Sequence, residues 1–303
     1  MRLLADLHPG ASLGRISRLG GGLSNGVFRV SYSNSGAGSG RFIVRLTTDH
    51  RVGSAANARK EYQTIATLHE ARVPAPALLL LDETGERLGR PGIVMEDAGR
   101  PSLTPRNLES WLEQLASAIL RLHAMAPEQF SLAHLPAEGP DDVQREVNKD
   151  LPEGLQDDPL AQSMRSALRL SVGRLTWAGP RLVHGDYWPG NTVWRRGRLW
   201  AIVDWTSAKV GDPRDDIAQC RFDLAMIQGS EAAARFLDIY QSHAPVPLQD
   251  VWFFDLLRGI DALSSFRSWL PGYHDIGLRE ITEAMMETRL RAFLTASLAE
   301  ATV

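Results

Sequence analysis

The stretch LVHGDYWPGNTVW, residues 182–194, decides the fold class of this chain together with the segment that follows it. The run RLWAIVDW, residues 198–205, and the shorter run TVW before it have strand composition, and RRG between them is a tight turn. We therefore predict a hairpin. Its open end brings the start of one strand beside the end of the other, so Asn191 and Asp204 meet there, and Asp186 lies on the loop that enters it.

These three side chains have the chemistry of a phosphoryl-transfer site. Asn191 and Asp204 offer a carboxamide and a carboxylate oxygen, which suit Mg²⁺, and Asp186 offers a second carboxylate that can receive a proton. The alternative is that Asp186 and Asn191 form turns and that Asp204 is a polar strand-end residue. Their joint spacing favours the functional interpretation.

Composition restricts the classes of protein that need to be considered. The 303 residues, 44% of them hydrophobic, can form two domains or one large two-lobed domain. A net charge of −3 lacks the basic excess of proteins that bind nucleic acid or anionic membranes, so we expect neither partner. Cys220 alone cannot form an intrachain disulfide, and no apolar run reaches the ~18 residues of a membrane span. We therefore expect a cytoplasmic protein.

The pattern of the chain changes near residue 98. Residues 1–98 predict five strands and one helix, and residues 99–303 predict a mainly helical second lobe that contains the hairpin. Residues 126–158 are rich in Pro, Gly and acidic residues and predict long surface connections around a short helix. The predicted strands are 14–20, 26–33, 41–48, 77–82 and 92–97, and the predicted helices are 55–71, 107–125, 215–229, 251–269 and 278–298.

The spacing H-G-D-x-x-x-x-N, here His184 to Asn191, is that of a kinase catalytic loop with Gly185 in place of the usual Arg. With the D-W at Asp204 and GDPRDDIA downstream, it resembles the aminoglycoside phosphotransferase and choline kinase group of small-molecule kinases. Upstream segments GGGLSNGVFRV, RFIVRL and GIVMEDAG follow in the order that this group shows, and the resemblance covers roughly residues 18–230. It implies an α+β, two-lobed protein-kinase-like fold with an antiparallel five-stranded sheet and a helix in the first lobe.

The resemblance also implies roles for the loop. Asp186 resembles the residue that orients the acceptor hydroxyl and takes its proton, and Asn191 and Asp204 resemble the Mg²⁺ ligands. His184 resembles the histidine that braces the loop. Asp216 resembles an aspartate that supports the loop from outside, although an N-cap of the following helix would explain it equally well.

The nucleotide, ATP or GTP, is expected in the first lobe. GGGLSNG can place backbone N–H groups, with Ser24 and Asn25, against phosphates, although glycine turns between strands are usually only turns. Arg45 stands where protein kinases have lysine, and we expect it to contact phosphate. Glu61 shares a helix face with two apolar residues, so it is predicted to point inward and to form an ion pair with Arg45.

The segment GIVMEDAG is expected to be the connection that holds the nucleobase, through backbone groups from Glu96 to Ala98. Nothing in the sequence selects adenine or guanine. The runner-up functions are a protein kinase, disfavoured by the short segment after Asp204, and a pseudokinase that binds nucleotide without turnover.

The acceptor pocket is expected in the last third of the chain. Residues 231–303 contain ten Asp or Glu against six Arg and no Lys, which mildly favours a cationic acceptor. Antibiotics such as aminoglycosides or macrolides, and metabolites such as an amino alcohol, homoserine or a sugar, all remain open. For most of the candidate residues, core packing or a solvated helix face is an equal or better explanation. The candidate contacts are Trp188, Asp255, Tyr273, His274 and Asp275, and an aromatic wall of Trp188, Trp205, Trp252 and Trp269 is a further expectation.

Overall fold

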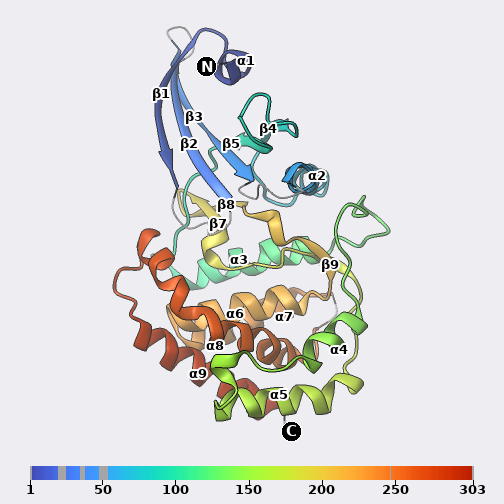
Figure 1. The fold of residues 1–303 in the computed structure, drawn as a ribbon. Helices are drawn as coiled ribbons and strands as arrows, with labels where there is room; N and C mark the ends of the chain where they lie inside the picture. The colour runs from blue at the N-terminus through green and yellow to red at the C-terminus, as the bar shows by residue number, and fades with distance from the viewer. Residues whose placement is uncertain (1, 20–24, 35–37, 48–53, 246, 302–303) are drawn as a thin grey trace.

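The structure is a computed structural model that describes residues 2–19, 25–34, 38–47, 54–245 and 247–301. A five-stranded antiparallel sheet lies at one end of the molecule and a group of helices at the other (Figure 1). The sheet has the order β1-β2-β3-β5-β4, which confirms the predicted five strands. The strands are β1 (Ala11–Arg18), β2 (Asn25–Asn34), β3 (Gly38–Thr47), β4 (Leu78–Asp82) and β5 (Gly92–Glu96).

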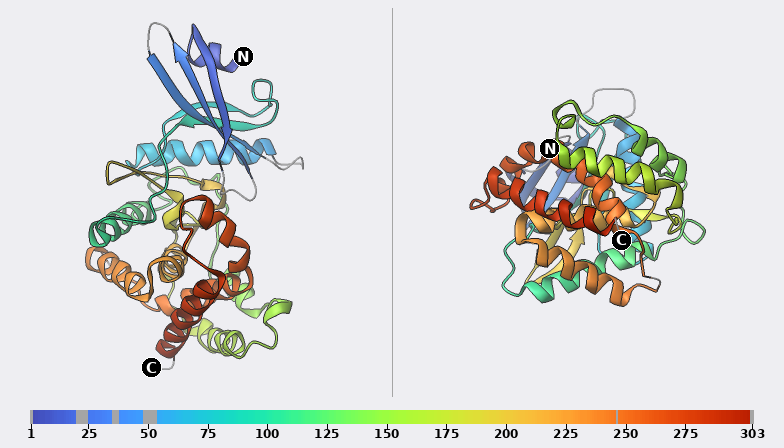
Figure 2. Two further views of the ribbon diagram at one scale, coloured as in Figure 1. Left: turned by 90° about the vertical axis from the view of Figure 1, so that its left-hand side faces the viewer. Right: turned by 90° about the horizontal axis from the view of Figure 1, so that it is seen from below.

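Along each strand the side chains alternate between the two faces of the sheet, and each face packs against other parts of the protein. Phe42 and Val44 of β3 pack with Leu4 of helix α1 (Arg2–Leu7), a short helix that the sequence did not reveal. Ile43, between them, joins the main core on the opposite face. Arg45 has the same parity as Ile43, so it points toward helix α2 (Ser54–Glu70), which lies between the sheet and the helices (Figure 2).

The other end of the molecule is mainly helical, as predicted. The expected helices at 107–125, 215–229, 251–269 and 278–298 are present, although the third continues to Asp275 through Pro271. Two helices, α5 and α7, were not predicted. The helices are α3 (Leu108–His123), α4 (Pro140–Asn148), α5 (Pro159–Ser171), α6 (Arg214–Gln228), α7 (Ser230–His243), α8 (Val251–Asp275) and α9 (Glu283–Glu300).

The predicted hairpin lies between the two ends. Strands β7 (Thr192–Arg195) and β8 (Arg198–Ile202) are antiparallel and begin with the pair Thr192↔Ile202. Arg196 and Gly197 both have positive φ, 49° and 75°, which is the backbone of a two-residue type I′ turn. A second small pair joins β6 (Arg181–Val183) to β9 (Lys209–Gly211).

Residues 126–158 contain more regular structure and more hydrogen bonds to the rest of the protein than their composition predicts. Helix α4 is the short helix expected there, and the segment before it binds β9, because the N–H of Glu138 donates to the carbonyl of Val210 at 2.8 Å. Within the described residues, no helix has the length and hydropathy to cross a membrane.

Candidate active site

The loop after β6 is held by buried hydrogen bonds. The N–H groups of His184 and Gly185 donate to the two carboxylate oxygens of Asp216, at 2.7 and 2.8 Å. Asp216 lies in the first turn of α6, whose N-cap is Pro213, and is fully buried, so its carboxylate binds the loop and does not cap the helix. Of the two interpretations offered by the sequence, the contacts therefore favour support of the loop over an N-cap.

His184 is fully buried and uses both ring nitrogens. Its Nε2 lies 3.0 Å from the carbonyl oxygen of Val203, and the N–H of Asp186 donates to its Nδ1 at 3.2 Å. Burial lowers the pKa of the imidazole, so the ring is neutral. A neutral ring with both nitrogens engaged holds the loop in place and has no free nitrogen for proton transfer.

Gly185 is required by the shape of this loop. Its φ is +79°, and a Cβ at this position would lie 2.4 Å from the carbonyl oxygen of Ser207. Any side chain would push the loop away from the segment that follows Asp204. The close approach therefore keeps the two halves of the site together.

Asn191 joins the predicted proton acceptor to the hairpin. Its Nδ2 donates to the backbone carbonyl of Asp186 at 2.8 Å and to Oδ2 of the same residue at 2.9 Å. Its own backbone carbonyl accepts from the N–H of Val203 at 2.9 Å, so Asn191 and Asp204 lie at the same end of the hairpin. Burial, and then the charge of Asp204, raise the pKa of Asp186 to about 7.

Arg45 and Glu61 form the ion pair that the sequence predicted, with Nε of Arg45 3.2 Å from Oε2 of Glu61. Both side chains are buried, and Glu61 shares its helix face with Ile65 and Leu68, as expected. The same guanidinium also binds the metal-site candidate, since its Nη2 lies 2.5 Å from Oδ1 of Asp204. Burial raises the pKa of Glu61 to about 7 despite the charge of Arg45.

Asn191 and Asp204 fit a magnesium ion as two ligands. The Nδ2 of Asn191 is used by Asp186, which leaves its Oδ1 for a cation. Oδ1 of Asp204 accepts from Arg45 and from the Thr206 hydroxyl, at 2.6 Å in the latter case, and no described residue donates to Oδ2. Two protein oxygens are a usual number for Mg²⁺, which takes its remaining ligands from phosphates and water.

Helix α2 contacts the metal-site segment, residues 204–206, through Lys60, for which the sequence predicts no role. Nζ of Lys60 donates to the carbonyl of Thr206 at 2.7 Å, two residues beyond Asp204. The residue precedes Glu61, so one turn of α2 binds the segment after Asp204 through Lys60 and binds Arg45, the partner of Asp204, through Glu61. A lysine next to an inward-pointing glutamate was the available signal, but the partner of Lys60 is 146 positions away in the sequence.

The hinge, defined here as residues 96–100, connects the sheet to the helices. It includes Glu96 and Ala98, the predicted nucleobase contacts. Ser24 lies outside the described residues, as does the side chain of Asn25.

Arg195 of β7 holds the hinge: its Nε donates to the carbonyl of Ala98 at 2.8 Å, and its Nη2 donates to the carbonyl of Asp97 at 2.6 Å. From the sequence alone, Arg195 is expected only in a tight turn.

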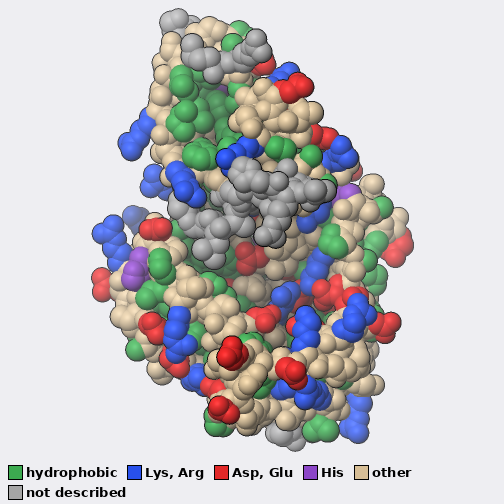
Figure 3. Space-filling model, in the orientation of Figure 1, with side chains coloured by type: hydrophobic (Ala, Val, Ile, Leu, Met, Phe, Trp, Pro, Cys, Tyr) green, Lys and Arg blue, Asp and Glu red, His purple; other side chains and the backbone are tan. Residues whose placement is uncertain are grey.

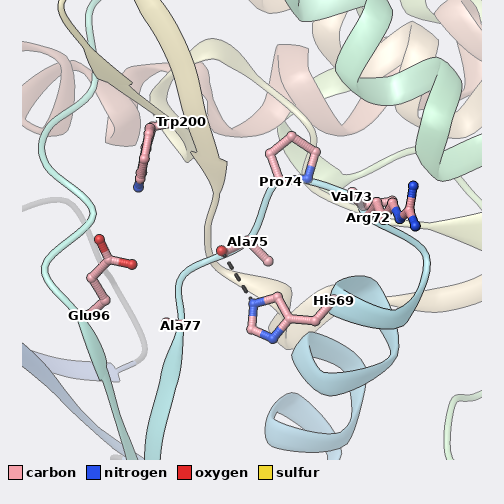
Figure 4. Close-up of a pocket in the computed structure, with 8 residues that line it drawn as sticks. All are labelled: His69, Arg72, Val73, Pro74, Ala75, Ala77, Glu96 and Trp200. Carbon is pink, nitrogen blue, oxygen red and sulfur yellow. Dashed lines mark hydrogen bonds between the residues drawn. The ribbon is translucent and has the colours of Figure 1, made fainter.

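A surface pocket of about 290 Å³ lies between the end of α2 and the hinge. Figure 4 shows Glu96 and Trp200 on one side of it and His69 on the other. Nη2 of Arg195 also binds the Glu96 carboxylate at 2.7 Å, and its guanidinium lies 4.5 Å above the Trp200 ring. The two side chains that Arg195 contacts therefore line this pocket.

The prediction that Asp255 contacts the acceptor is wrong. Asp255 is fully buried, and its Oδ2 accepts from Arg221 and from the Ser297 hydroxyl. A carboxylate that points into the helical core and forms an ion pair there cannot bind a ligand from solution. On the face of the molecule seen in Figure 3, acidic and basic side chains are interspersed. That face therefore shows no acidic patch that could bind a cationic acceptor in place of Asp255.

Of the remaining acceptor candidates, Trp188 and Tyr273 contact each other, and His274 and Asp275 are the last two residues of α8. Trp188 packs edge-on against Tyr273, with ring centroids 5.4 Å apart, and the Tyr273 hydroxyl donates to the buried Asp223. His274 binds the carbonyl of Ile281 through Nε2 at 2.9 Å, and Asp275 is exposed. The expected wall of four indoles is wrong in one member, because Trp205 is fully buried against His184.

A family model described as "Phosphotransferase enzyme family" matches residues 15–250, which is most of the chain. Among curated proteins, "Acyl-CoA dehydrogenase family member 10" of Mus musculus is 26% identical over 178 residues, or 54% of this chain. Those residues are 16% of that protein, so the chain spans only a small part of the length of this relative.

Several solved structures share the fold at low sequence identity. The GDP complex of wild-type aminoglycoside 2'-phosphotransferase-IIIa has a TM-score of 0.61 and 19% identity, covering 99% of this chain and 97% of that one. Macrolide 2'-phosphotransferase MphH from Brachybacterium faecium has a TM-score of 0.61 and 21% identity, covering 96% of both chains. A thermostable mutant of aminoglycoside phosphotransferase APH(4)-Ia, with AMP-PNP and hygromycin B, has a TM-score of 0.66 and 19% identity over 97% of both chains.

Proposed function

Because the chain belongs to the phosphotransferase enzyme family, we propose that it transfers the γ-phosphate of ATP or GTP to a hydroxyl group of a small molecule, with Mg²⁺ as its metal ion. One observation carries the proposal. Asn191 donates to Asp186 with its side chain and accepts from Val203 with its backbone. It therefore holds a proton acceptor and a pair of metal ligands at one end of the hairpin.

Asp186 is the proton acceptor in this proposal. Asn191 holds its Oδ2, and no described residue donates to its Oδ1, which is available to an acceptor hydroxyl. A carboxylate whose pKa lies at about 7 accepts a proton near neutral pH more readily than an ordinary aspartate does. Its role is to orient the hydroxyl and to take its proton as the new bond to phosphorus forms.

The cationic part of the site is built from Arg45 and the metal ligands. Phosphoryl transfer requires positioning and positive charge against the phosphates, with little covalent assistance from the protein. Glu61 orients the Arg45 guanidinium from the buried side. Magnesium bound at Asn191 and Asp204 would neutralise part of the charge on the phosphates.

The acceptor is proposed to bind beside Trp188, whose indole is partly exposed and supported by Tyr273. Relatives of the same fold are aminoglycoside and macrolide phosphotransferases by name, which favours an antibiotic acceptor. A metabolite such as an amino alcohol, homoserine or a sugar is the second candidate. The expectation of a cationic acceptor loses Asp255 as support and now rests on composition alone.

The test is release of nucleoside diphosphate by the purified protein with Mg²⁺ and either ATP or GTP. The acceptor panel contains aminoglycosides, macrolides, choline, homoserine and sugars. We expect one acceptor class to raise the release rate far above the rate without acceptor, and Asp186→Asn to abolish that increase. Asp238→Asn, on an exposed position of α7, is the matched control and keeps the wild-type rate.

A pseudokinase would behave differently in the same assay. It would bind nucleotide with Mg²⁺, but no acceptor would raise its release rate, and Asp186→Asn would change nothing. Asp186, Asn191 and Asp204 are all present and brought together, which favours turnover over binding alone.

A further inference from the structure

The carbonyl groups of the hinge are almost all occupied. Arg195 donates to the carbonyls of Asp97 and Ala98, at 2.6 and 2.8 Å. Arg29 of β2 donates to the next carbonyl, that of Gly99, at 3.1 Å. The N–H of Trp194 donates to the carbonyl of Arg100 at 3.0 Å. Four consecutive carbonyls therefore accept hydrogen bonds from the protein itself, two of them from one guanidinium.

The side chains around the hinge make this arrangement rigid. Arg29 binds the Asp97 carboxylate with two nitrogens, at 2.8 and 3.1 Å, and both residues are buried. Gly99 has a φ of +127°, and a Cβ there would lie 3.0 Å from the Val193 side chain of β7. The hinge is thus packed along the hairpin that carries Asn191 and Asp204, and its carbonyls are not free to turn toward a ligand.

One N–H group of the same segment is available, that of Ala98. The N–H of Gly99 lies 3.3 Å from Oδ1 of Asp97, and the pair Phe42↔Glu96 places the N–H of Asp97 on the β3 side, opposite the carbonyl of Arg41. The N–H of Ala98 has no hydrogen-bond partner among the described residues. The carbonyl of Glu96 is not one of those that Arg195 binds. The hinge therefore offers one hydrogen-bond donor and at most one uncommitted carbonyl, beside a guanidinium whose N–H groups are used by the hinge carbonyls and by the Glu96 carboxylate.

A purine edge must match this set of groups. Adenine presents one N–H₂ group and the acceptor N1 on its Watson–Crick edge, so it needs one carbonyl and one N–H. Guanine and hypoxanthine reverse this order, with the acceptor O6 in place of the N–H₂ group and the donor N1–H in place of the acceptor N1. Guanine adds the 2-amino group as a second donor, so it needs more than one acceptor. A donor group of the base that approaches carbonyls already bound to a guanidinium is left poorly paired and meets the N–H groups of that guanidinium.

We propose that Arg195 is a specificity-determining residue that makes this enzyme select adenine over guanine nucleotides. The inference rests on the proposed function, because it assumes that the hinge holds the base. The inference goes beyond the proposed function by naming ATP as the phosphoryl donor. Relatives of the same fold have been seen with GDP in one case and with AMP-PNP in another, so the fold itself does not decide the base.

The test measures binding of ADP, GDP and inosine diphosphate to the full chain by calorimetry, which needs no acceptor. We expect ADP to bind at least about tenfold more tightly than GDP, the effect of about one well-placed hydrogen bond. Inosine has O6 and N1–H but lacks the 2-amino group, and we expect its diphosphate to bind as weakly as that of guanosine. If it binds as tightly as ADP, a steric exclusion of the 2-amino group replaces our explanation.

Three variants connect the selectivity to Arg195. Arg195→Met removes the donors and the charge but keeps an apolar stem over Trp200, and we expect the ratio of ADP to GDP affinity to fall at least about threefold. Arg195→Lys keeps the charge without the fork and should give an intermediate ratio. Arg198→Met, on the exposed side of β8, is the matched control and should leave the ratio unchanged.

Two results would overturn the inference: equal binding of ADP and GDP to the wild type, or an unchanged ratio in Arg195→Met with a wild-type melting temperature. If Arg195→Met does not fold, Arg195→Lys decides between these outcomes. Failure of the proposed function looks different, because then no acceptor raises the release of diphosphate, whatever the ratio of ADP to GDP affinity. If none of the three diphosphates binds, this inference fails as well.

Discussion

At the scale of single residues, Asp186 depends on the groups that surround it. Asn191 holds one of its carboxylate oxygens, and burial with the nearby charge of Asp204 raises its pKa. His184 and Asp216 hold the backbone of the loop that carries Asp186 by hydrogen bonds. The sequence predicts this group of residues because their spacing is short and a hairpin has only one open end.

Replacement of Asp186 by Asn tests its role directly. We expect kcat to fall by about 10²- to 10⁴-fold, the usual contribution of a positioned proton acceptor. The Kd of Mg·ATP should stay within about twofold of the wild type, since the lost interaction is with the acceptor. Steady-state kinetics and calorimetry measure the two quantities, and an unchanged kcat would remove Asp186 from the mechanism.

Gly185 gives a prediction about stability. Gly185→Ala combines a positive φ with a Cβ 2.4 Å from the Ser207 carbonyl, so the free energy of unfolding should fall by more than about 2 kcal/mol. Gly197→Ala is the control, because its φ is +75° but no atom lies within 4 Å of the added Cβ. It should cost only about 1 kcal/mol. Equal losses in urea unfolding would show that the contact with Ser207 is not tight.

At the scale of elements, periodicity predicts what a local pattern controls. The inward direction of Glu61 follows from its helix face, and the hairpin follows from two short strands and a turn. Partners far apart in sequence do not follow. The sequence predicts a turn residue at Arg195 and a ligand contact at Asp255, because nothing near them in the chain reveals the hinge carbonyls or Arg221.

The link between α2 and the metal-site segment predicts a kinetic effect. Lys60→Met removes the hydrogen bond to the Thr206 carbonyl, so the segment that carries Asp204 loses a support. We expect the KM for Mg·ATP to rise about three- to tenfold, corresponding to the loss of one hydrogen bond. Lys149→Met, on an exposed lysine, is the control and should match the wild type. An unchanged KM in Lys60→Met would mean that α2 does not support the metal site.

At the scale of the whole molecule, the sheet and the helices meet through α2, the hinge and the hairpin (Figure 2). The general arrangement could be predicted from the change of pattern along the chain, and the boundary at residue 98 remains a prediction. Helices α5 and α7 were not predicted although their buried residues recur at helical spacing, because alanines, which are only weakly apolar, form part of each buried stripe. Their stability comes from packing in the main core, which a single sequence does not display.

A buried charge cluster joins β9, α6 and α8 and makes stability depend on pH. Burial alone would raise the pKa of Asp215, but Arg258 and Lys209 overcome it and lower the pKa to about 2. The folded pKa is below the unfolded one, so the stabilisation is complete above about pH 4 and is lost as the pH falls toward 2.

Asp215→Asn measures this contribution. At pH 7 we expect a loss of roughly 2 kcal/mol or more in the free energy of unfolding, and a clearly smaller loss at pH 3. Urea unfolding of both proteins at the two pH values gives the comparison. A loss that is the same at both would show that the carboxylate charge does not matter.

The central claim is that the residues at the open end of the hairpin transfer phosphate to a small-molecule hydroxyl. The most direct measurement follows the radiolabelled γ-phosphate of ATP onto the acceptor identified by the panel, with separation of the phosphorylated product. We predict label in the product for the wild type with Mg²⁺, and none for Asp186→Asn or in the presence of a magnesium chelator. Label that reaches the acceptor equally well with Asp186→Asn, or only inorganic phosphate from the wild type, would contradict the account.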